Sequence, residues 1–458
     1  MSSNNNTTGE TAVSRLSLGV KLGYGVGEIG INIFIVTTGM FLLYYMTNVL
    51  KINPALAGTS LIFAKLWDVI SDPIMGKISD STISKHGRRR PFLLYGSVPF
   101  GIAFLILFIT PPFSAEMAKT IYVVLLYALG CTAFTIVAVP FSSMVAEMSD
   151  NYNERMSITA YRMSFASVGA LVAGGVAMPL VNLGGGGEAG FLVMAQVFAA
   201  VMIFSSLLCF FATKKAPTLA PVEDVPPILQ QIKIALKNIP FFMLMISYLI
   251  QSLAAGVLMA GFVFFVKYVM GQSEEAMGIV FPIFLVTGIA FIPVWNMIGK
   301  KMGKIKAYKI GLIILSIMQL SLFFTGPDNM SLFYIQIFLL GIGFSSFQLF
   351  PFSMLPDTIE YDQLNSGMRR EGIFSGMWAS GQKTAYSLGP AIVGISLGIF
   401  HFNEGLGNHQ PESVALGIRL VFCVFPALMF LLSFIPFNKY DLTEARFEEI
   451  KRLISEKA

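Results

Sequence analysis

Residues 65–76 read Lys-Leu-Trp-Asp-Val-Ile-Ser-Asp-Pro-Ile-Met-Gly and place two carboxylates in a segment that is otherwise apolar enough to lie in lipid. Asp68 and Asp72 are four residues apart, so in a helix they share one face, about 6 Å apart along the axis. An ionised aspartate at bilayer depth costs on the order of 2.5–3.5 kcal/mol on insertion scales, and two on one face also repel each other. Such a pair persists where a cation offsets it. The segment therefore predicts a cation site inside a membrane.

The composition is that of a membrane protein. The chain has 458 residues, of which 55% are hydrophobic and 12% charged, and its mean hydropathy is +0.71. A soluble domain carries about 25% charged residues. The three cysteines lie in apolar runs and the three histidines form no cluster, so no metal site is expected. There is also no paired nucleophile and base and no nucleotide loop, so the sequence does not indicate an enzyme or a cofactor.

Runs of about twenty apolar residues predict twelve membrane spans. They lie near residues 21–47, 55–79, 91–111, 118–147, 156–183, 189–212, 240–270, 276–298, 307–325, 330–356, 372–402 and 415–437. Lys and Arg alternate between the loops: they crowd the loops after spans 2, 6, 8 and 10 and are sparse on the other side. By the positive-inside rule both termini are cytoplasmic in a multi-pass plasma membrane protein. This alternation also accounts for the net charge of +5, so no nucleic-acid partner is expected.

The two halves of the chain echo each other. Pro-Phe-Ser-Ser-Met at residues 140–144 matches Pro-Phe-Ser-Met at 351–354, and an acidic residue follows each, Glu147 and Asp357. Six plus six spans with a parallel repeat is the plan of the major facilitator transporters. The predicted fold is therefore an all-α membrane protein of twelve helices in two six-helix halves. Its expected parts are a disordered N-terminus (1–18), a first bundle (19–212), a cytoplasmic connection (213–238), a second bundle (239–437) and a cytoplasmic tail (438–458).

The motif at residues 67–76, continued by Asp80 and by Gly-Arg-Arg-Arg-Pro-Phe at 87–92, resembles the signature of the glycoside–pentoside–hexuronide:cation symporters. The resemblance continues over residues 24–27, 44–47, 135–141 and 357–361, and so covers nearly the whole chain. It implies cation-driven symport of a sugar-like solute across the bacterial inner membrane by alternating access. The coupling ion would be Na⁺ or H⁺, and the carrier a monomer in the lipid bilayer.

The resemblance also assigns a cation site. Asp68 and Asp72 match the cation-binding carboxylates of the family's melibiose carrier, Thr135 matches a neighbouring hydroxyl, and oxygen ligands suit a hard cation. Ser71 stands where that carrier has an asparagine, which leaves the choice between Na⁺ and H⁺ open. The alternative is a static network in which Lys65 or another basic residue neutralises the pair.

The sugar site departs from the same carrier. Asn32 and Ala138 replace two aspartates, and Ser142 replaces a tryptophan, whereas Arg162 and Lys383 match. Two intramembrane cations would suit a small polar substrate such as a uronate, or would simply balance Asp68 and Asp72. The expected substrate-binding residues are Asn32, Ser142, Arg162, Trp378 and Lys383, although Trp378 would equally serve packing.

Charged residues at the cytoplasmic ends of the halves predict a gate of ion pairs, with basic topology signals as the alternative. The gate residues are Asp80, Arg88, Arg155, Asp357, Glu360 and Arg370. Glu28 in span 1 is expected to pair with a cytoplasmic basic residue rather than to join the polar cavity. Two competing functions stay open: a lysolipid-type or other non-sugar carrier of the same fold, and a membrane receptor or sensor without transport.

Overall fold

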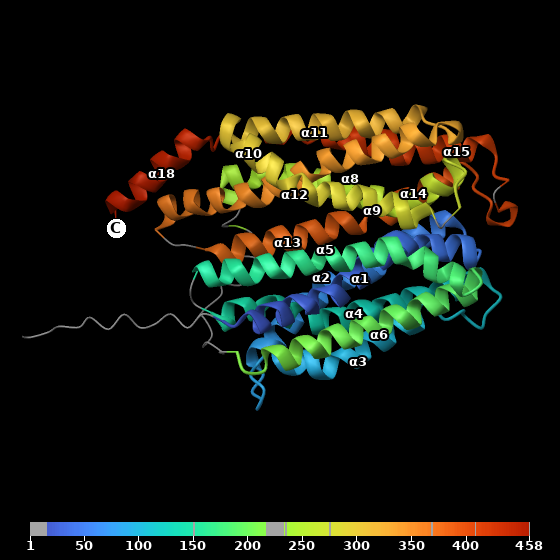
Figure 1. Ribbon diagram of the computed structural model, residues 1–458, viewed down its shortest axis with the longest axis horizontal. Helices are drawn as coiled ribbons and strands as arrows, with labels where there is room; N and C mark the ends of the chain where they lie inside the picture. The colour runs from blue at the N-terminus through green and yellow to red at the C-terminus, as the bar shows by residue number, and fades with distance from the viewer. Residues whose placement is uncertain are drawn as a thin grey trace, which may run out of the picture.

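The first half of the protein is a bundle of six helices. The structure, a computed structural model, describes residues 16–149, 152–216, 233, 236–273, 276–367, 370–407 and 409–457, and all regular structure in these ranges is helical. The helices lie roughly parallel, as Figure 1 shows. The first bundle consists of α1 (Leu18–Tyr44), α2 (Pro54–Ser81), α3 (Arg90–Leu107), α4 (Glu116–Met148), α5 (Tyr152–Leu183) and α6 (Gly187–Thr213).

The second half repeats this plan with more breaks in its helices. It consists of α8 (Ile239–Phe264), α9 (Met277–Ala290) with α10 (Ile292–Met302), α11 (Lys304–Ser321), α12 (Met330–Ser366), α13 (Glu371–Ser387) with α14 (Gly389–Ile399), and α15 (Glu412–Arg419) followed by α16 (Phe425–Leu432) and α17 (Phe434–Phe437). Pro293, Pro390 and Pro426 stand in the first turns of α10, α14 and α16. Proline has no backbone N–H and clashes with the preceding turn, so these helices restart at the prolines.

Ten segments of the described chain are long and apolar enough to cross a membrane. The charged helix α2 and the pair α13–α14, whose first member has 17 residues, complete the two sets of six. The twelve-span prediction agrees with this architecture but differs from it in detail. Predicted spans 8, 11 and 12 are divided, at Phe291, Leu388 and Ser433, and predicted span 10 runs ten residues past 356, to Ser366. Neither Pro351 nor Pro356 ends α12, so the polar run that follows stays helical.

A matched pair of π-helical turns shows the internal repeat directly. The turn η1 (Tyr45–Val49) ends α1 in the first half, and η2 (Phe265–Val269) ends α8 in the second. In both turns the N–H of the next residue bonds back five residues, from Leu50 to Tyr45 and from Met270 to Phe265. The repeated Pro140 and Pro351 likewise lie inside α4 and α12.

The end of the molecule that holds α18 (Glu444–Lys457) and the start of α1 is called the terminal end (Figure 1). The two halves touch at the other end, where α2 packs on α14, α5 on α9, and α1 on α8. A Cβ on Gly394 would lie 2.3 Å from the Pro54 carbonyl oxygen, and one on Gly58 would lie 2.5 Å from that of Pro390. Only glycine permits this approach of α2 and α14.

Polar contacts reinforce this junction, at the end where the halves touch. Lys267 Nζ donates to Tyr44 Oη at 2.6 Å, and the Tyr268 hydroxyl bonds to Asn48. All four residues belong to the ends of α1 and α8 or to the π-helical turns that follow them. The repeat thus places two equivalent turns face to face, and they hold the halves together.

The tail forms a helix, α18, which packs against α12 at the terminal end. Leu442 and Ile450 are buried, and the Arg446 guanidinium lies over the Tyr361 ring. Most of the predicted disordered N-terminus and of the predicted connection lies outside the described residues. The division into domains therefore stays a prediction.

Candidate functional site

Asp72 joins the two halves near the middle of the molecule. Its Oδ1 accepts a hydrogen bond of 2.8 Å from the Thr135 hydroxyl in α4, and its Oδ2 lies 2.6 Å from Lys383 Nζ in α13. Asp72 and Thr135 belong to the first half, whereas Lys383 belongs to the second. The carboxylate is therefore held by a hydroxyl of its own half and by a cation of the other.

Asp68 lies one turn before Asp72 and is less exposed. Lys65 Nζ donates to its Oδ2 at 3.3 Å, while Oδ1 is buried without a hydrogen-bond partner among the described residues. Ser71, which stands between Asp68 and Asp72 in the sequence, is buried, and its hydroxyl lies 3.5 Å from that of Thr135. A buried acceptor without a donor is costly, because its desolvation is not offset.

Two carboxylates and two hydroxyls form an oxygen-rich donor set. Hard cations prefer oxygen ligands, and the unpartnered Oδ1 of Asp68 is available as one. The set therefore fits either a bound alkali cation or a proton on a carboxylate. Lys65 pairs with Asp68 and Lys383 pairs with Asp72, so the alternative of a network that balances both carboxylates also fits this geometry.

Packing of α2 on α4 orients this cluster. Trp67 Nε1 donates to the Thr132 hydroxyl at 2.8 Å. The ammonium groups of Lys65 and Lys383 lie over the rings of Tyr127 and Phe134, 5.1 and 5.6 Å from the ring centroids. Cation–π contacts of this kind stabilise an ammonium that has lost part of its water.

Glu28 and Arg162 form a second charged pair, entirely within the first half. Arg162 Nε donates to Glu28 Oε2 at 2.7 Å and Nη2 approaches Oε1 at 3.4 Å. Asn32 Nδ2 also donates to Glu28 Oε1, at 3.3 Å, and the guanidinium lies over the Phe141 ring. The expected cytoplasmic partner for Glu28 is therefore wrong, and Arg162 balances Glu28 rather than Asp68 or Asp72. The two residues are 134 positions apart, and only their shared rarity as charges within spans could have suggested the pairing.

The remaining predicted substrate residues differ in exposure. The Lys383 side chain is 44% exposed despite its ion pair, and Ser142 is exposed as well. Trp378 is 2% exposed and stacks on Tyr248 with ring centroids 4.2 Å apart. The structure thus places Trp378 in the aromatic core of the second half, as the packing alternative expects.

Polar side chains that are exposed in the middle of spans define the space between the halves. Ser164 in α5 and Ser380 and Thr384 in α13 are exposed, like Lys383. Polar residues at this depth ordinarily face a water-filled cavity rather than lipid. Because the halves meet at the opposite end, we infer that the space bordered by these residues opens towards the terminal end.

Two predicted gate residues of the first half, Asp80 and Arg88, belong to one cluster of ion pairs at the terminal end. Arg88 and Arg89 both bind Glu147 Oε1, at 2.7 and 2.6 Å, and Arg89 also binds Asp80 at 2.6 Å. Arg155 Nε donates to the Ser149 carbonyl oxygen at 2.6 Å. Glu147, which accepts from two arginines, was not among the predicted gate residues, although its place in the repeated motif could have indicated it.

The second half carries a matching cluster. Lys304 Nζ lies 2.8 Å from Asp357 Oδ2, and Arg370 lies 3.6 Å from Asp362. The Oε2 atom of Glu360 is buried without a hydrogen-bond partner among the described residues. Each of these ion pairs, like those of the first half, joins residues of a single half.

Comparison with known proteins agrees with this architecture. Residues 23–444 match the family model described as "MFS/sugar transport protein". The chain is 29% identical over 444 residues to the putative glycoside/cation symporter YagG of Escherichia coli (strain K12), covering 96% of this chain and 95% of that protein. It is 24% identical over 441 residues to the glucuronide carrier protein homolog of the same organism, covering 95% of each.

Solved transporter structures share the fold. The nucleoside transporter NupG superposes with a TM-score of 0.62 at 14% identity, over 92% of this chain and 99% of that one. The chain therefore belongs to the MFS/sugar transport protein family. It is a multi-pass membrane transporter of the major facilitator fold and not an enzyme.

Proposed function

We propose that this protein is a symporter that couples a cation, Na⁺ or H⁺, to the movement of a sugar or sugar acid by alternating access. The observation that carries the proposal is the contact of Asp72 with Lys383 across the two halves, beside the unpartnered Oδ1 of Asp68. The names of two relatives, glycoside/cation symporter and glucuronide carrier homolog, support the same substrate class.

The geometry supports a direct coupling between cation and substrate. A cation at Asp68 and Asp72 competes with the Lys383 ammonium for the same carboxylate, because two positive charges within a few ångströms repel each other. Binding of the cation therefore releases Lys383 from Asp72. The released ammonium then donates hydrogen bonds to a substrate hydroxyl or carboxylate in the cavity between the halves.

The proposed substrate site on the first half is polar, and its charges already neutralise each other. Glu28 neutralises Arg162, and Asn32 donates to the same carboxylate. A neutral sugar binds such a group through its hydroxyls without breaking the ion pair. An acidic sugar instead relies on Lys383, whose charge the coupling cation sets free, so both substrate types remain within the proposal.

The proposal includes a topology. Both termini are cytoplasmic in a plasma membrane protein, so the cavity in this structure opens to the cytoplasm. The residues at the terminal end, Asp80, Arg88, Arg155, Asp357, Glu360 and Arg370, then form the inner gate. They close that gate by exchanging partners when the halves rock together.

Uptake into proteoliposomes tests the function. Radiolabelled neutral sugars, methyl glycosides and uronates are offered under an inward Na⁺ gradient, an inward proton gradient, or neither. We expect accumulation of at least one sugar under one of the two gradients, and its loss in Asp72→Asn. The control Asp328→Asn changes an exposed acid outside the site and keeps uptake. Uptake that ignores both gradients would exclude symport.

A further inference from the structure

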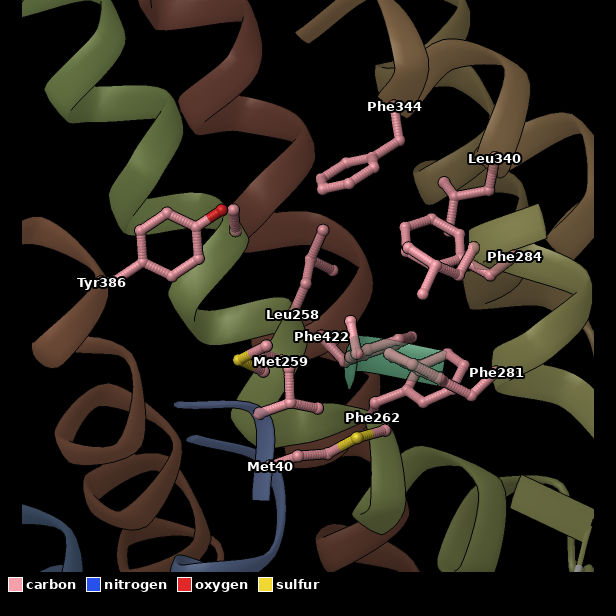
Figure 2. A pocket seen from close by; sticks show the side chains of 14 residues that line it. Met40, Leu258, Met259, Phe262, Phe281, Phe284, Leu340, Phe344, Tyr386 and Phe422 are labelled. Atoms are coloured by element: carbon pink, nitrogen blue, oxygen red, sulfur yellow. The ribbon is translucent and has the colours of Figure 1, made fainter. Parts of the chain in front are cut away.

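A partly open apolar cavity lies between the halves, beyond the polar residues of the proposed site. Its volume is about 120 Å³, and Figure 2 shows phenylalanine and methionine side chains gathered around it. Val36, Met40 and Ala170 line it from the first half. The second half contributes most of the remaining wall, including Met259, Phe281, Phe284 and Phe344. Among the described residues that line it, Tyr386 has the one polar side-chain group.

Three helices contribute residues both to the polar site and to the wall of the cavity. Val36 follows Asn32 by one turn of α1, Ala170 follows Arg162 by about two turns of α5, and Tyr386 follows Lys383 by three residues of α13. At 1.5 Å rise per residue, these steps place the cavity roughly 5–12 Å beyond the polar groups. Figure 2 shows the Tyr386 hydroxyl on the side of its ring that faces the other lining residues.

The size and lining of the cavity suit a small apolar group. An apolar cavity of about 150 Å³ in another protein stays dry and binds benzene, so about 120 Å³ holds one ring or a short alkyl chain. Methionine side chains adapt to differing shapes, and aromatic rings stack on planar ligands. A sugar hydroxyl is a poor occupant, because it would find few hydrogen-bond partners there.

We propose that this cavity binds the apolar aglycone of a glycoside whose sugar ring lies among Asn32, Arg162 and Lys383. This inference rests on the proposed function and narrows it to glycosides with a phenyl-sized or short alkyl aglycone. The coupling cation and the sugar are recognised by the polar groups, and the aglycone by the cavity. Each methylene that enters strengthens binding by roughly threefold to fourfold, until the cavity is full after about four to six carbons.

The test compares methyl, butyl, octyl and phenyl glycosides of several sugars for binding to the purified protein. For the sugars that bind, phenyl and butyl glycosides are expected to bind at least tenfold more tightly than methyl glycosides, and octyl glycosides little better than butyl. Ala170→Leu fills the cavity with an isopropyl group and removes this preference while methyl glycosides still bind. Ala200→Leu makes the same exchange at an exposed position of α6 and keeps the preference.

A second variant tests the same cavity if Ala170→Leu fails to fold. Phe284→Ala enlarges the cavity and shifts the preference from butyl towards longer chains. Equal affinity for methyl and phenyl glycosides, or a preference that survives Ala170→Leu, overturns the aglycone site and leaves sugar symport intact. If neither glycosides nor free sugars bind with or without the cation, the proposed function fails and the aglycone site fails with it.

Discussion

Lys383 in the second half binds Asp72 in the first at 2.6 Å, although the halves otherwise meet at the end opposite to the termini. The Lys383 side chain is 44% exposed and that of Asp72 23% exposed, so the pair borders the polar space between the halves and does not lie in a packed interior. An ion pair in this position exchanges easily with a competing cation, because water supports both partners when they separate.

The first prediction concerns the competition at Asp72. Replacing Lys383 with methionine removes the ammonium that occupies the carboxylate, so the coupling cation should bind more tightly, on the order of tenfold. Sugar transport should nevertheless be lost, because the proposed hydrogen-bond donor is gone. Isothermal titration with Na⁺, and at two pH values, measures the first effect, and proteoliposome uptake measures the second. Lys301→Met at the exposed end of α10 is the control. Weaker cation binding in Lys383→Met would contradict the competition.

The second prediction concerns the buried pair of Glu28 and Arg162. Glu28→Gln leaves the guanidinium without its carboxylate, and breaking a buried pair costs about 3–5 kcal/mol. Arg162 is partly exposed, so the loss of unfolding free energy should lie near the lower end of that range. The double variant Glu28→Gln with Arg162→Met should recover most of it, because no unpaired charge remains. Denaturant unfolding in detergent measures the difference, with the exposed Glu412→Gln as control. A double variant as unstable as the single one would show that the pair itself is not the cause.

The third prediction concerns the contact of α2 with α14. Gly394→Ala places a methyl group 2.3 Å from the Pro54 carbonyl oxygen, so the halves can no longer close fully at this end. The protein should shift towards a state that is open there, and transport should fall severalfold or more. Spin labels at Ser114→Cys and His409→Cys report the separation of the halves, and Cys131, Cys209 and Cys423 are buried and do not interfere.

Gly376→Ala in α13 is the matched control, because no atom lies within 4 Å of the added methyl. It should leave both the label distance and transport unchanged. An unaltered distance distribution in Gly394→Ala would mean that the glycine contact does not hold the halves together.

The fourth prediction concerns the proposed inner gate. In this conformation Asp357 binds Lys304, and Arg155 binds a backbone carbonyl, each within its own half. If closure at the terminal end brings charges of the two halves together, then Asp357→Asn and Arg155→Gln should each slow transport at least tenfold while substrate binding persists. Glu449→Gln in the tail helix is the control. Unchanged uptake rates in both variants would leave these residues with a purely local role.

Much of the architecture was predictable because lipid imposes strict limits on sequence. Spans of about twenty apolar residues, alternating Lys and Arg, and the repeated Pro-Phe-Ser motifs determine the helices and their order. The extension of α12 to Ser366 was not predictable in this way. Hydropathy marks where a helix leaves the membrane, and α12 continues beyond that point through polar residues.

The site was predictable only in part. The position of Asp68 and Asp72 on one face follows from their spacing, and their roles stay predictions that rest on the family resemblance. The pairing of Glu28 with Arg162 depends on the packing of α1 against α5, which no local pattern records. The apolar cavity was not foreseen at all. It is a space left between seven separate elements, and its volume is set by how their side chains fail to fill it.

The close approach of Gly58 and Gly394 means that closure depends on different interactions at the two ends of the carrier. Backbone meets backbone there, and the polar contacts at the same end, Lys267 with Tyr44 and Tyr268 with Asn48, pair no opposite charges, so closure at that end depends little on ion pairs. The terminal end carries many charged residues, of which Asp80 and Lys304 have exposed side chains, and the attraction between exposed charges falls as salt increases. Ionic strength should therefore change the rate of one half of the transport cycle much more than the other. A single variable of the solution would then separate the two conformational steps without any mutation.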